Sequence, residues 1–259
     1  MDKATAPQTS ERQSQAHQPV LIVLLNDTLG DLARRRGELP DWIAKGLRLP
    51  ARMLAVVDPR GGAGLPSPHG LAGVVVTGST AMVTDREEWS QRTAAWLHVV
   101  VAADVPVLGI CYGHQLLACA MGGHVDYNPK GREFGTVEVR LLPEAADDIL
   151  LSHLPPVFRA QASHSQSVLR LPDGAVPLAA NGHDRHHAFR LGRAAWGVQF
   201  HPEFDADIVR AIARARDESL RADGLCPETI IAAIEETPEA ASVLARFGQI
   251  ATNGAAPAR

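Results

Sequence analysis

The chain has 259 residues, of which 46% are hydrophobic, 21% charged and 5% aromatic. Its 22 glycines and 18 prolines exclude a collagen-like or low-complexity chain, and its length allows one or two globular domains. A net charge of −4 gives no general electrostatic reason to bind nucleic acid or a membrane surface, so neither partner is expected. No apolar run approaches the ~20 residues that span a bilayer.

The cysteines and the chain ends predict a cytoplasmic protein. Cys111, Cys119 and Cys226 form no C-x-x-C pair and are odd in number, which suits a reducing compartment with at most one thiol selected for reactivity. Residues 1–18 lack the apolar segment of a signal peptide, so we predict a disordered polar tail there. Residues 251–259 are predicted to be frayed.

The first half of the chain alternates apolar runs with amphipathic stretches. Continuous Val/Ile/Leu runs are expected where a parallel sheet is covered on both faces. Residues 86–103 repeat apolar side chains at helical spacing, and His114–Met121 is predicted to be a helix closed by Gly122 and Gly123. The runs predicted to be buried strands are Val20–Leu25, Met53–Val57, Gly73–Thr77 and Val105–Ile110.

After Gly135 the pattern changes to short strands, beginning with the alternating residues 136–142 (TVEVRLL). The further predicted strands are Val157–Ala160, Val168–Leu171, Pro177–Ala180, His187–Arg190 and Ala195–Gln199. A helix over about Asp205–Ala222 follows, and Pro227–Phe247 is predicted to add one or two more. We therefore predict an α/β fold, with a doubly wound, mostly parallel sheet and an additional small antiparallel β segment.

The strongest local signal is the segment GICYGHQ at residues 109–115, where an apolar strand runs through Gly-x-Cys-x-Gly directly into a helix. This order is typical of a nucleophile elbow, a sharp turn that projects one side chain from the carboxyl edge of a sheet. The helix dipole and the free N–H groups of the first turn favour a thiolate there. Cys111 is therefore predicted to be a nucleophile. The alternative is a buried structural cysteine between two packing glycines.

A thiolate nucleophile needs a base, and the base needs an orienting group. His201-Pro202-Glu203 supplies both directly after the apolar run at residues 195–200. In extended backbone the side chains at i and i+2 point to the same side, and Pro202 biases His201 toward that geometry. We predict that Glu203 orients the imidazole of His201 toward Cys111. The alternative for an isolated His-Pro-Glu segment is a surface turn.

Together, GICYGHQ at residues 109–115 and GVQFHPE at residues 197–203 resemble the class I (triad-type) glutamine amidotransferases. The resemblance is nearest to the amidotransferase domain of GMP synthase and its stand-alone relatives, and covers about residues 20–215. Further matches are Gly122-Gly123, Glu133-Phe134-Gly135 and Ser163-His164-Ser165. The resemblance implies a flavodoxin-like amidotransferase domain over residues 19–222, followed by a C-terminal helical extension and frayed tail over residues 223–259.

The resemblance also implies a reaction. Cys111 would attack the γ-amide carbon of glutamine, with His201 as general base and acid and Glu203 as the residue that orients it. Ammonia would leave, and water would hydrolyse the γ-glutamyl thioester to glutamate. No metal or organic cofactor is expected.

Two backbone N–H groups are expected to hold the oxyanion of this reaction. One belongs to Tyr112, which follows the nucleophile, and the other to Gly78 or Ser79 in the Gly-containing turn after an earlier strand. The positions that match the family's glutamine pocket are Gln115, Ser163, His164 and Ser165. For His164 a purely structural hydrogen bond is an equal alternative.

Two departures from GMP synthase bear on the acceptor of the ammonia. The chain carries Thr77-Gly78-Ser79 where those domains usually carry Gly-Gly-Pro, and it shows no synthetase domain, P-loop or other nucleotide motif. A separate synthetase subunit is therefore expected to receive the ammonia.

Two other functions remain open. A γ-glutamyl peptidase or hydrolase would use the same triad on glutathione-like compounds, and comparing glutamine with γ-glutamyl peptides as substrates separates the two. An inactive regulatory protein that retains the fold would leave Cys111 unreactive toward a glutamine-mimicking electrophile.

Four other segments receive structural interpretations. His183–His187 is predicted to be a solvated turn rather than a metal site, because adjacent side chains of a strand point to opposite faces. Cys119 is predicted to lie in the core and Cys226 to be peripheral. Arg34–Arg36 is predicted to be a solvated helix face, with contact to substrate carboxylates as the alternative.

Overall fold

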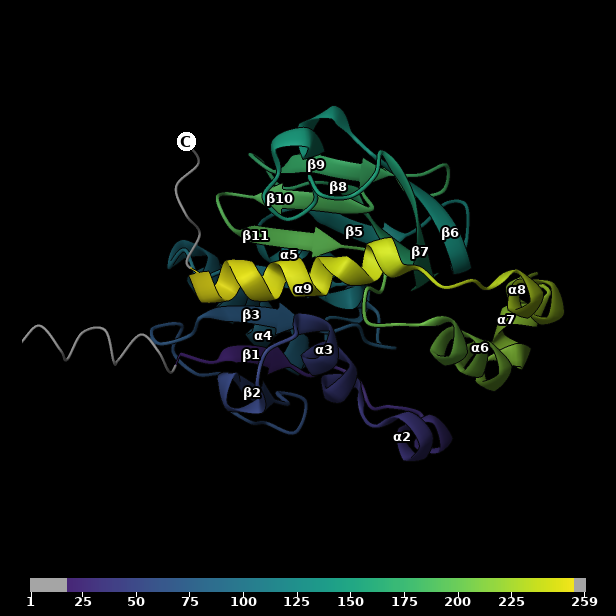
Figure 1. Cartoon of the computed structure of the whole chain (residues 1–259), viewed down its shortest axis with the longest axis horizontal. Helices are drawn as coiled ribbons and strands as arrows, with labels where there is room; N and C mark the ends of the chain where they lie inside the picture. The colour runs from purple at the N-terminus through teal and green to yellow at the C-terminus, as the bar shows by residue number, and fades with distance from the viewer. Residues whose placement is uncertain (1–17, 254–259) are drawn as a thin grey trace, which may run out of the picture.

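The computed structural model describes residues 18–253, and a large sheet covered by helices on both faces occupies its centre (Figure 1). The predicted polar tail at residues 1–18 lies outside the described residues except for Gln18. The predicted frayed segment at residues 251–259 lies outside them from residue 254 onward, and residues 251–253 form the last turn of a helix.

Within residues 18–253, five of the nine strands of the large sheet run parallel, because they are short apolar runs, most of them buried on both faces. In the described residues its strand order is β2-β1-β3-β4-β11-β10-β9-β6-β7. The parallel strands are β2 (Leu54–Val57), β1 (Val20–Val23), β3 (Gly73–Val76), β4 (Val107–Ile110) and β11 (Ala195–Val198). The predicted runs form these strands, each one or two residues shorter at an end. The prediction of a doubly wound, mostly parallel sheet is confirmed.

The other half of the sheet is antiparallel and continues from β11 without a break. Its strands are β10 (Ala188–Leu191), β9 (Val176–Ala180), β6 (Glu133–Leu141) and β7 (Val157–His164). A separate two-stranded antiparallel sheet pairs β5 (His124–Tyr127) with β8 (Gln166–Arg170). Of the strands predicted after Gly135, only Val168–Leu171 falls in this small sheet, as part of β8. The others form the antiparallel half of the large sheet, except Ala195–Gln199, which forms the parallel strand β11. The strand β5 was not expected from the pattern of residues 124–127.

Helices bury apolar faces on both sides of the sheet. On one side α4 (Glu88–Ala102) and α5 (Tyr112–Ala120) pack their apolar residues against β1, β3 and β4. On the other side α3 (Leu39–Leu47) and α9 (Pro238–Asn253) bury Ile43, Val243 and Phe247 in the main core. In Figure 1, α3 and α9 lie in front of the sheet. The C-terminal helix therefore shares the core of the domain that precedes it.

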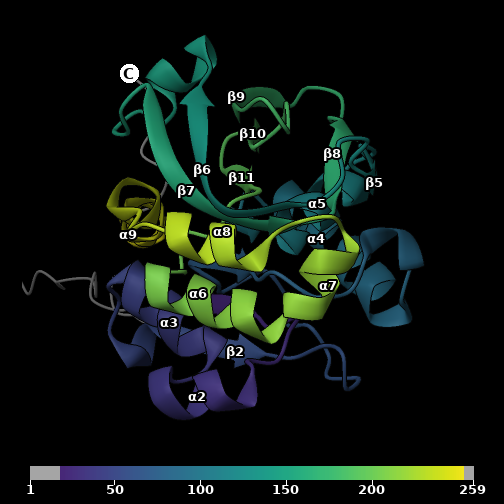
Figure 2. The ribbon, with the colours of Figure 1, turned by 90° about the vertical axis from the view of Figure 1, so that its right-hand side faces the viewer.

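A second group of helices lies beyond the end of the sheet toward which β11 points, at the right of Figure 1. This group consists of α2 (Gly30–Arg36), α6 (Ala206–Ala215), α7 (Asp217–Ala222) and α8 (Pro227–Ala233). Figure 2 looks onto that end and shows α8, α6 and α2 in layers. The prediction of one helix over Asp205–Ala222 is wrong, because the backbone leaves the helical region at Arg216 and separates α6 from α7.

The helix α3 was not predicted from the sequence, although its buried residues Leu39, Ile43 and Leu47 recur at helical spacing. Local caps explain how α3 begins. The side chain of Asp41 accepts a hydrogen bond from the N–H of Glu38 at 2.8 Å, and the two residues form a reciprocal capping box. Pro40 lies in the first turn, where its missing N–H costs nothing. The N–H of Leu39 is further held by Thr28 Oγ1 at 2.8 Å, which fixes the loop after β1 against the start of α3.

Candidate active site

The site lies where three neighbouring parallel strands end. Gly78, Cys111 and His201 follow the carboxyl ends of β3, β4 and β11, which are adjacent in the sheet. The carboxyl edge of an open α/β sheet is the usual place for a ligand site, because loops from several strands meet there. Segments that are far apart in the sequence are brought together in this way.

The turn at Cys111 has the strained backbone of a nucleophile elbow. Cys111 has φ 51° and ψ −102°, a conformation that side-chain-bearing residues rarely adopt, and it caps the N-terminus of α5. The flanking glycines make the turn possible. A Cβ on Gly109 would lie 2.4 Å from the carbonyl oxygen of Gly113, and a Cβ on Gly113 would lie 2.3 Å from that of Val76. The predicted elbow is thus present in the fold.

The side chains of His201 and Glu203 form a buried pair beside this turn. His201 Nδ1 and Glu203 Oε1 are 2.8 Å apart, and the two side chains are 6% and 0% exposed. The second carboxylate oxygen, Oε2, has no partner in the described part of the chain. His201 is therefore the one side chain in residues 18–253 that hydrogen-bonds the Glu203 carboxylate. Burial disfavours the charged ring, but Glu203 and the Cys111 sulfur outweigh it and raise the pKa of His201 to about 10.

The turn after β3 leaves no room for a side chain beside this group. A Cβ on Gly78 would lie 2.9 Å from His201 Cε1 and 3.6 Å from the Cβ of Cys111. The N–H groups of Ser79 and Tyr112 donate to no other group within residues 18–253. Both residues border the same cleft as Cys111, so their N–H groups are available to a developing oxyanion.

A cleft of about 310 Å³ opens in front of Cys111. The predicted pocket residues border it, and they are Gln115, Ser163, His164 and Ser165. Gln115 is held by two bonds from its Nε2, to the carbonyl of Gln166 at 2.7 Å and to Gln199 Oε1 at 3.0 Å. The carbonyl oxygen of Ser163 lies 3.7 Å from Cys111 Sγ. The fold thus brings every predicted pocket residue to the nucleophile.

The ring of His164 is engaged in a buried hydrogen-bond network. Its Nε2 lies 2.9 Å from Glu133 Oε2 and its Nδ1 lies 2.9 Å from the carbonyl of Gln166. His187 Nε2 is also 2.9 Å from Glu133 Oε2, and Asn181 donates to the other carboxylate oxygen at 2.7 Å. Although burial acts to raise it, these bonds and the two histidines hold the pKa of Glu133 far below its usual range. The structural alternative for His164 fits this geometry.

This network contains the only cluster of metal-ligand type within residues 18–253. The ligand atoms of Glu133, His164 and His187 lie within 4.8 Å of one another. The 2.9 Å contacts join these atoms directly to one another, because Glu133 Oε2 is bonded to the Nε2 atoms of both His164 and His187. We therefore interpret the cluster as a support for the turn that carries Ser163.

The structure corrects two of the structural interpretations. His183–His187 is not a solvated turn throughout, because Asp184 and His187 are only 2% and 0% exposed. The ring of His187 is hydrogen-bonded to the buried Glu133. Cys119 is exposed rather than in the core, because it faces outward in the last turn of α5. Cys226 is exposed, as predicted.

The side chains of Arg34–Arg36 on α2 form ion pairs with carboxylates. Arg36 bonds Asp205 and also Asp207, the latter at 2.7 Å, while Arg34 pairs with Asp31 on its own helix. These pairs tie α2 to the start of α6 and leave the run outside the cleft of Cys111.

Two arginines at the cleft were not found from the sequence. Arg132 Nη1 donates to Ser219 and Asp223 on and after α7, and Arg216 Nη1 donates to Ser163 Oγ at 3.2 Å. Among residues 18–253 no carboxylate pairs with Arg216, although its side chain borders the cleft. Burial lowers the pKa of Arg216, and the nearby Arg132 lowers it further. No spacing or motif marks these residues, because the break between α6 and α7 alone places Arg216 there.

A thiol on a strained elbow, an imidazole bonded to a carboxylate and two N–H groups without partners in residues 18–253 are the kinds of groups that cysteine acyl transfer uses. The family follows from comparison with known proteins. Residues 69–208, more than half of the chain, match the family model for glutamine amidotransferase class-I. The chain belongs to this family, as its two motifs predicted.

The relatives are similar over part of their length. A GMP synthase of Aeropyrum pernix is 42% identical over 132 residues, which are 51% of this chain and 24% of that protein. A glutamine-hydrolysing GMP synthase subunit of Methanosarcina mazei is 42% identical over 114 residues, 44% of this chain and 58% of that protein. The matched regions therefore cover less than two thirds of either relative.

Solved structures of similar fold cover nearly the whole chain. A glutamine amidotransferase from Methylobacillus flagellatus has a TM-score of 0.70 at 23% identity, covering 91% of this chain and 93% of its own. One from Thermotoga maritima has a TM-score of 0.68 at 20% identity, covering 92% and 99%. At these identities the likeness concerns the fold. Within residues 18–253 no helix combines the length and apolar character that a membrane span requires.

Proposed function

We propose that this chain hydrolyses the γ-amide of glutamine to glutamate and ammonia through a γ-glutamyl thioester on Cys111. The observation that carries the proposal is the placement of Cys111, on its strained elbow, beside the His201–Glu203 pair at the carboxyl edge of the sheet. Family membership supports the substrate, because the named relatives are glutamine-hydrolysing proteins.

The first half of the reaction breaks the amide bond. The Cys111 thiolate attacks the γ-carbonyl carbon, and the oxygen takes up negative charge beside the N–H groups of Tyr112 and of Gly78 or Ser79. The raised pKa of His201 keeps its ring charged near neutral pH, so that it can give a proton to the departing nitrogen. Ammonia leaves, and the glutamyl group remains on the sulfur.

The second half releases glutamate. His201 takes a proton from water, the hydroxide adds to the thioester carbon, and the carbon–sulfur bond breaks. Glu203 keeps the ring oriented through both halves because its Oε1 accepts from Nδ1. The sulfur returns to the thiolate, stabilised by the N-terminus of α5.

The glutamyl part of the substrate would occupy the cleft of Cys111. Its α-carboxylate matches Arg216, a half-buried guanidinium that lacks a carboxylate partner within the described residues. The carbonyl groups of the turn after β7 and the amide oxygen of Gln115 can accept from the α-ammonium group. The ammonia would pass to a separate synthetase subunit. The Methanosarcina mazei relative suggests such a partner, because it is itself called a subunit.

Release of glutamate and ammonia from glutamine by the purified chain tests this function. We expect turnover that falls at least ~10⁴-fold in Cys111→Ala, because the thioester can no longer form. Cys119→Ala removes an exposed thiol on the same helix and is expected to retain full activity. Equal activity in wild type and Cys111→Ala would contradict the proposal.

Covalent labelling tests the reactivity of Cys111 independently of the turnover rate, which a synthetase subunit could change. A glutamine analogue with an electrophilic carbon in place of the amide should add one mass equivalent to the peptide that carries Cys111. Cys119 and Cys226 should remain unlabelled, although both are exposed. A silent chain whose Cys111 is unreactive would instead be the inactive regulatory protein.

A further inference from the structure

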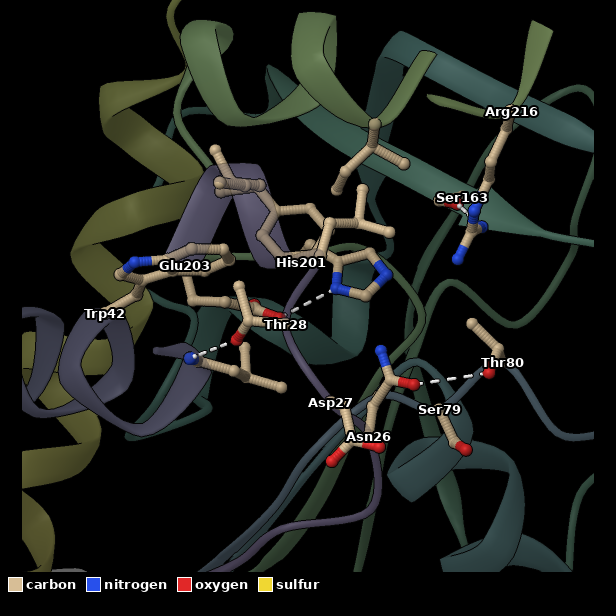
Figure 3. A pocket seen from close by; sticks show the side chains of 16 residues that line it. Asn26, Asp27, Thr28, Trp42, Ser79, Thr80, Ser163, His201, Glu203 and Arg216 are labelled. Carbon is tan, nitrogen blue, oxygen red and sulfur yellow. Dashed lines mark hydrogen bonds and ion pairs between the residues drawn. The ribbon is translucent and has the colours of Figure 1, made fainter. Parts of the chain in front are cut away.

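A second hollow lies on the far side of His201 from Cys111. It shares Ser79, Thr80, Ser163 and Arg216 with the cleft of Cys111, so the two spaces meet at these residues. Cys111, however, borders only the cleft, whereas His201 and Glu203 border only the hollow. In Figure 3 the His201 ring lies between Trp42 on one side and Arg216 on the other.

This hollow has aromatic and aliphatic walls together with polar groups, among them Asn26, Asp27 and Thr28. Phe204 stacks on the His201 ring with centroids 4.1 Å apart and planes 5° apart. Trp42 meets Phe204 edge to face at 6.0 Å, which extends the aromatic wall from the predicted base toward α3. Leu29 and Leu39 add aliphatic surface from the α2–α3 segment. Such a lining binds an apolar group by removing it from water.

The chemistry fixes which part of a substrate reaches this hollow. In amide hydrolysis the general acid gives its proton to the leaving nitrogen, so that nitrogen lies beside His201. Whatever the nitrogen carries must then extend past His201, away from Cys111 and the glutamyl cleft. Ammonia carries nothing. The hollow has a volume of about 80 Å³, several times the ~10–15 Å³ that a cavity needs on the same measure to hold one water molecule.

We infer that this site also hydrolyses γ-glutamyl amides whose leaving amine bears a small apolar group, and that the hollow beyond His201 holds that group. The inference rests on the proposed function of the Cys111 site and names a substrate class for it. The isobutyl group is suited to the hollow, because its four carbons can pack against the Trp42–Phe204 wall.

The reaction balances as for glutamine. The thiolate adds to the γ-carbonyl carbon, the carbon–nitrogen bond breaks, and the amine leaves with the proton from His201. Water then gives a hydroxide to the thioester carbon and its proton to His201, and the sulfur leaves as thiolate. The net change is one γ-glutamyl amide and one water giving glutamate and the free amine.

A series of synthetic amides tests the inference. Glutamate release is measured from glutamine, γ-glutamylisobutylamide and γ-glutamyl-2-aminoethylamide, a charged amide of similar reach. We expect kcat/KM for the isobutylamide to exceed that for the aminoethylamide about tenfold or more, because an ammonium group would have to lose water against Trp42 and Phe204. The two carboxylates that border the hollow are already bonded, Asp27 to Arg60 and Glu203 to His201. Cys111→Ala should abolish release from every amide.

A variant that fills the hollow ties this preference to its walls. Leu29 is 40% exposed at the start of α2, so Leu29→Trp adds bulk from an exposed position. We expect the ratio of kcat/KM for isobutylamide to that for glutamine to fall at least about tenfold. Leu169→Trp is the matched control, because Leu169 is 37% exposed on β8 and borders neither space. It should leave the ratio unchanged.

The outcomes separate this inference from the proposed function. Glutamine turnover without turnover of the isobutylamide, or with equal turnover of the isobutylamide and the aminoethylamide, overturns the inference alone. An unchanged ratio in Leu29→Trp does the same. Absence of Cys111-dependent turnover of all three compounds overturns both. Turnover of the isobutylamide without turnover of glutamine supports the inference and limits the function to substituted amides.

Discussion

The two spaces on either side of His201 differ in origin and in chemistry. The cleft of Cys111 is bordered mostly by polar residues of the loops that follow the sheet and of α5 and α7. The hollow beyond His201 adds apolar side chains of α2, α3 and α6 to the polar residues of the loop after β1. The proposed nucleophile, base and oxyanion groups all follow strand ends. The difference teaches that the edge of the sheet positions the proposed reacting groups. The helices α2, α3 and α6 shape the space proposed for the leaving amine.

Removal of His201, the proposed base that lies between the two spaces, is expected to lower kcat more than any other change. His201→Ala should lower kcat roughly 10⁶-fold, and Glu203→Gln roughly 10⁴-fold, because the latter weakens orientation while the ring remains. Since His201 borders the hollow and acts on the amide in the cleft, the loss should be the same for glutamine and for the isobutylamide. Steady-state assays on both substrates provide the check.

Equal losses in His201→Ala and Glu203→Gln would contradict the orienting role of Glu203. A loss that differs between the two substrates would contradict the placement of the leaving amine beside His201.

Filling the space between Gly78 and the His201 ring, at the edge of the hollow, should have an intermediate effect. Gly78→Ala places a Cβ 2.9 Å from His201 Cε1, so the ring must shift. A displacement of this kind costs roughly 10²-fold in kcat when reacting groups lose alignment. Gly61→Ala is the matched control, because a Cβ there meets nothing within 4 Å. Wild-type kcat in Gly78→Ala would show that His201 does not act from its observed position.

The smallest expected effect concerns stability and pH. His201 has a folded-state pKa of about 10, above the ~6.5 of the unfolded chain, so its charged form stabilises the fold fully below pH ~6.5. This contribution is lost as the pH rises through about 10. Glu203→Gln removes the opposite charge that favours the ring cation. Urea unfolding should therefore show a difference between wild type and Glu203→Gln that shrinks by about 1 kcal/mol or more between pH 6 and pH 10.5.

Other groups that titrate near pH 10 are common to both proteins and cancel in this difference. If the difference in unfolding free energy between wild type and Glu203→Gln stays constant from pH 6 to pH 10.5, the ring of His201 is not positively charged in the folded protein.

The elements that the sequence predicted are those with strong local patterns. The apolar runs at β1, β3 and β4 are buried on both faces, so hydrophobicity alone identifies them. In contrast, α2 is a short helix with a single buried residue, Leu32, and its position depends on ion pairs from Arg36 to the start of α6. Such contacts join segments about 170 residues apart, which no local pattern records.

The same distinction holds at the site. Gly-x-Cys-x-Gly and His-Pro-Glu each encode a local geometry, and the predicted group around Cys111 and His201 follows once their strands are neighbours. Arg216, by contrast, reaches the cleft because the helix breaks at that residue, where a continuous helix over Asp205–Ala222 was expected. Trp42, on α3, packs against Phe204 and lines the hollow, although the sequence of α3 contains no functional motif.

The sequence by itself determined the family, the doubly wound sheet and the identity of the predicted nucleophile, base and orienting carboxylate, because each depends on a short run of neighbouring residues. Only the tertiary structure decided that the ring of His164 turns toward Glu133, and that Trp42 and Phe204 extend a wall from His201. The physical reason is that burial and pairing between distant segments depend on how helices pack at the end of the sheet.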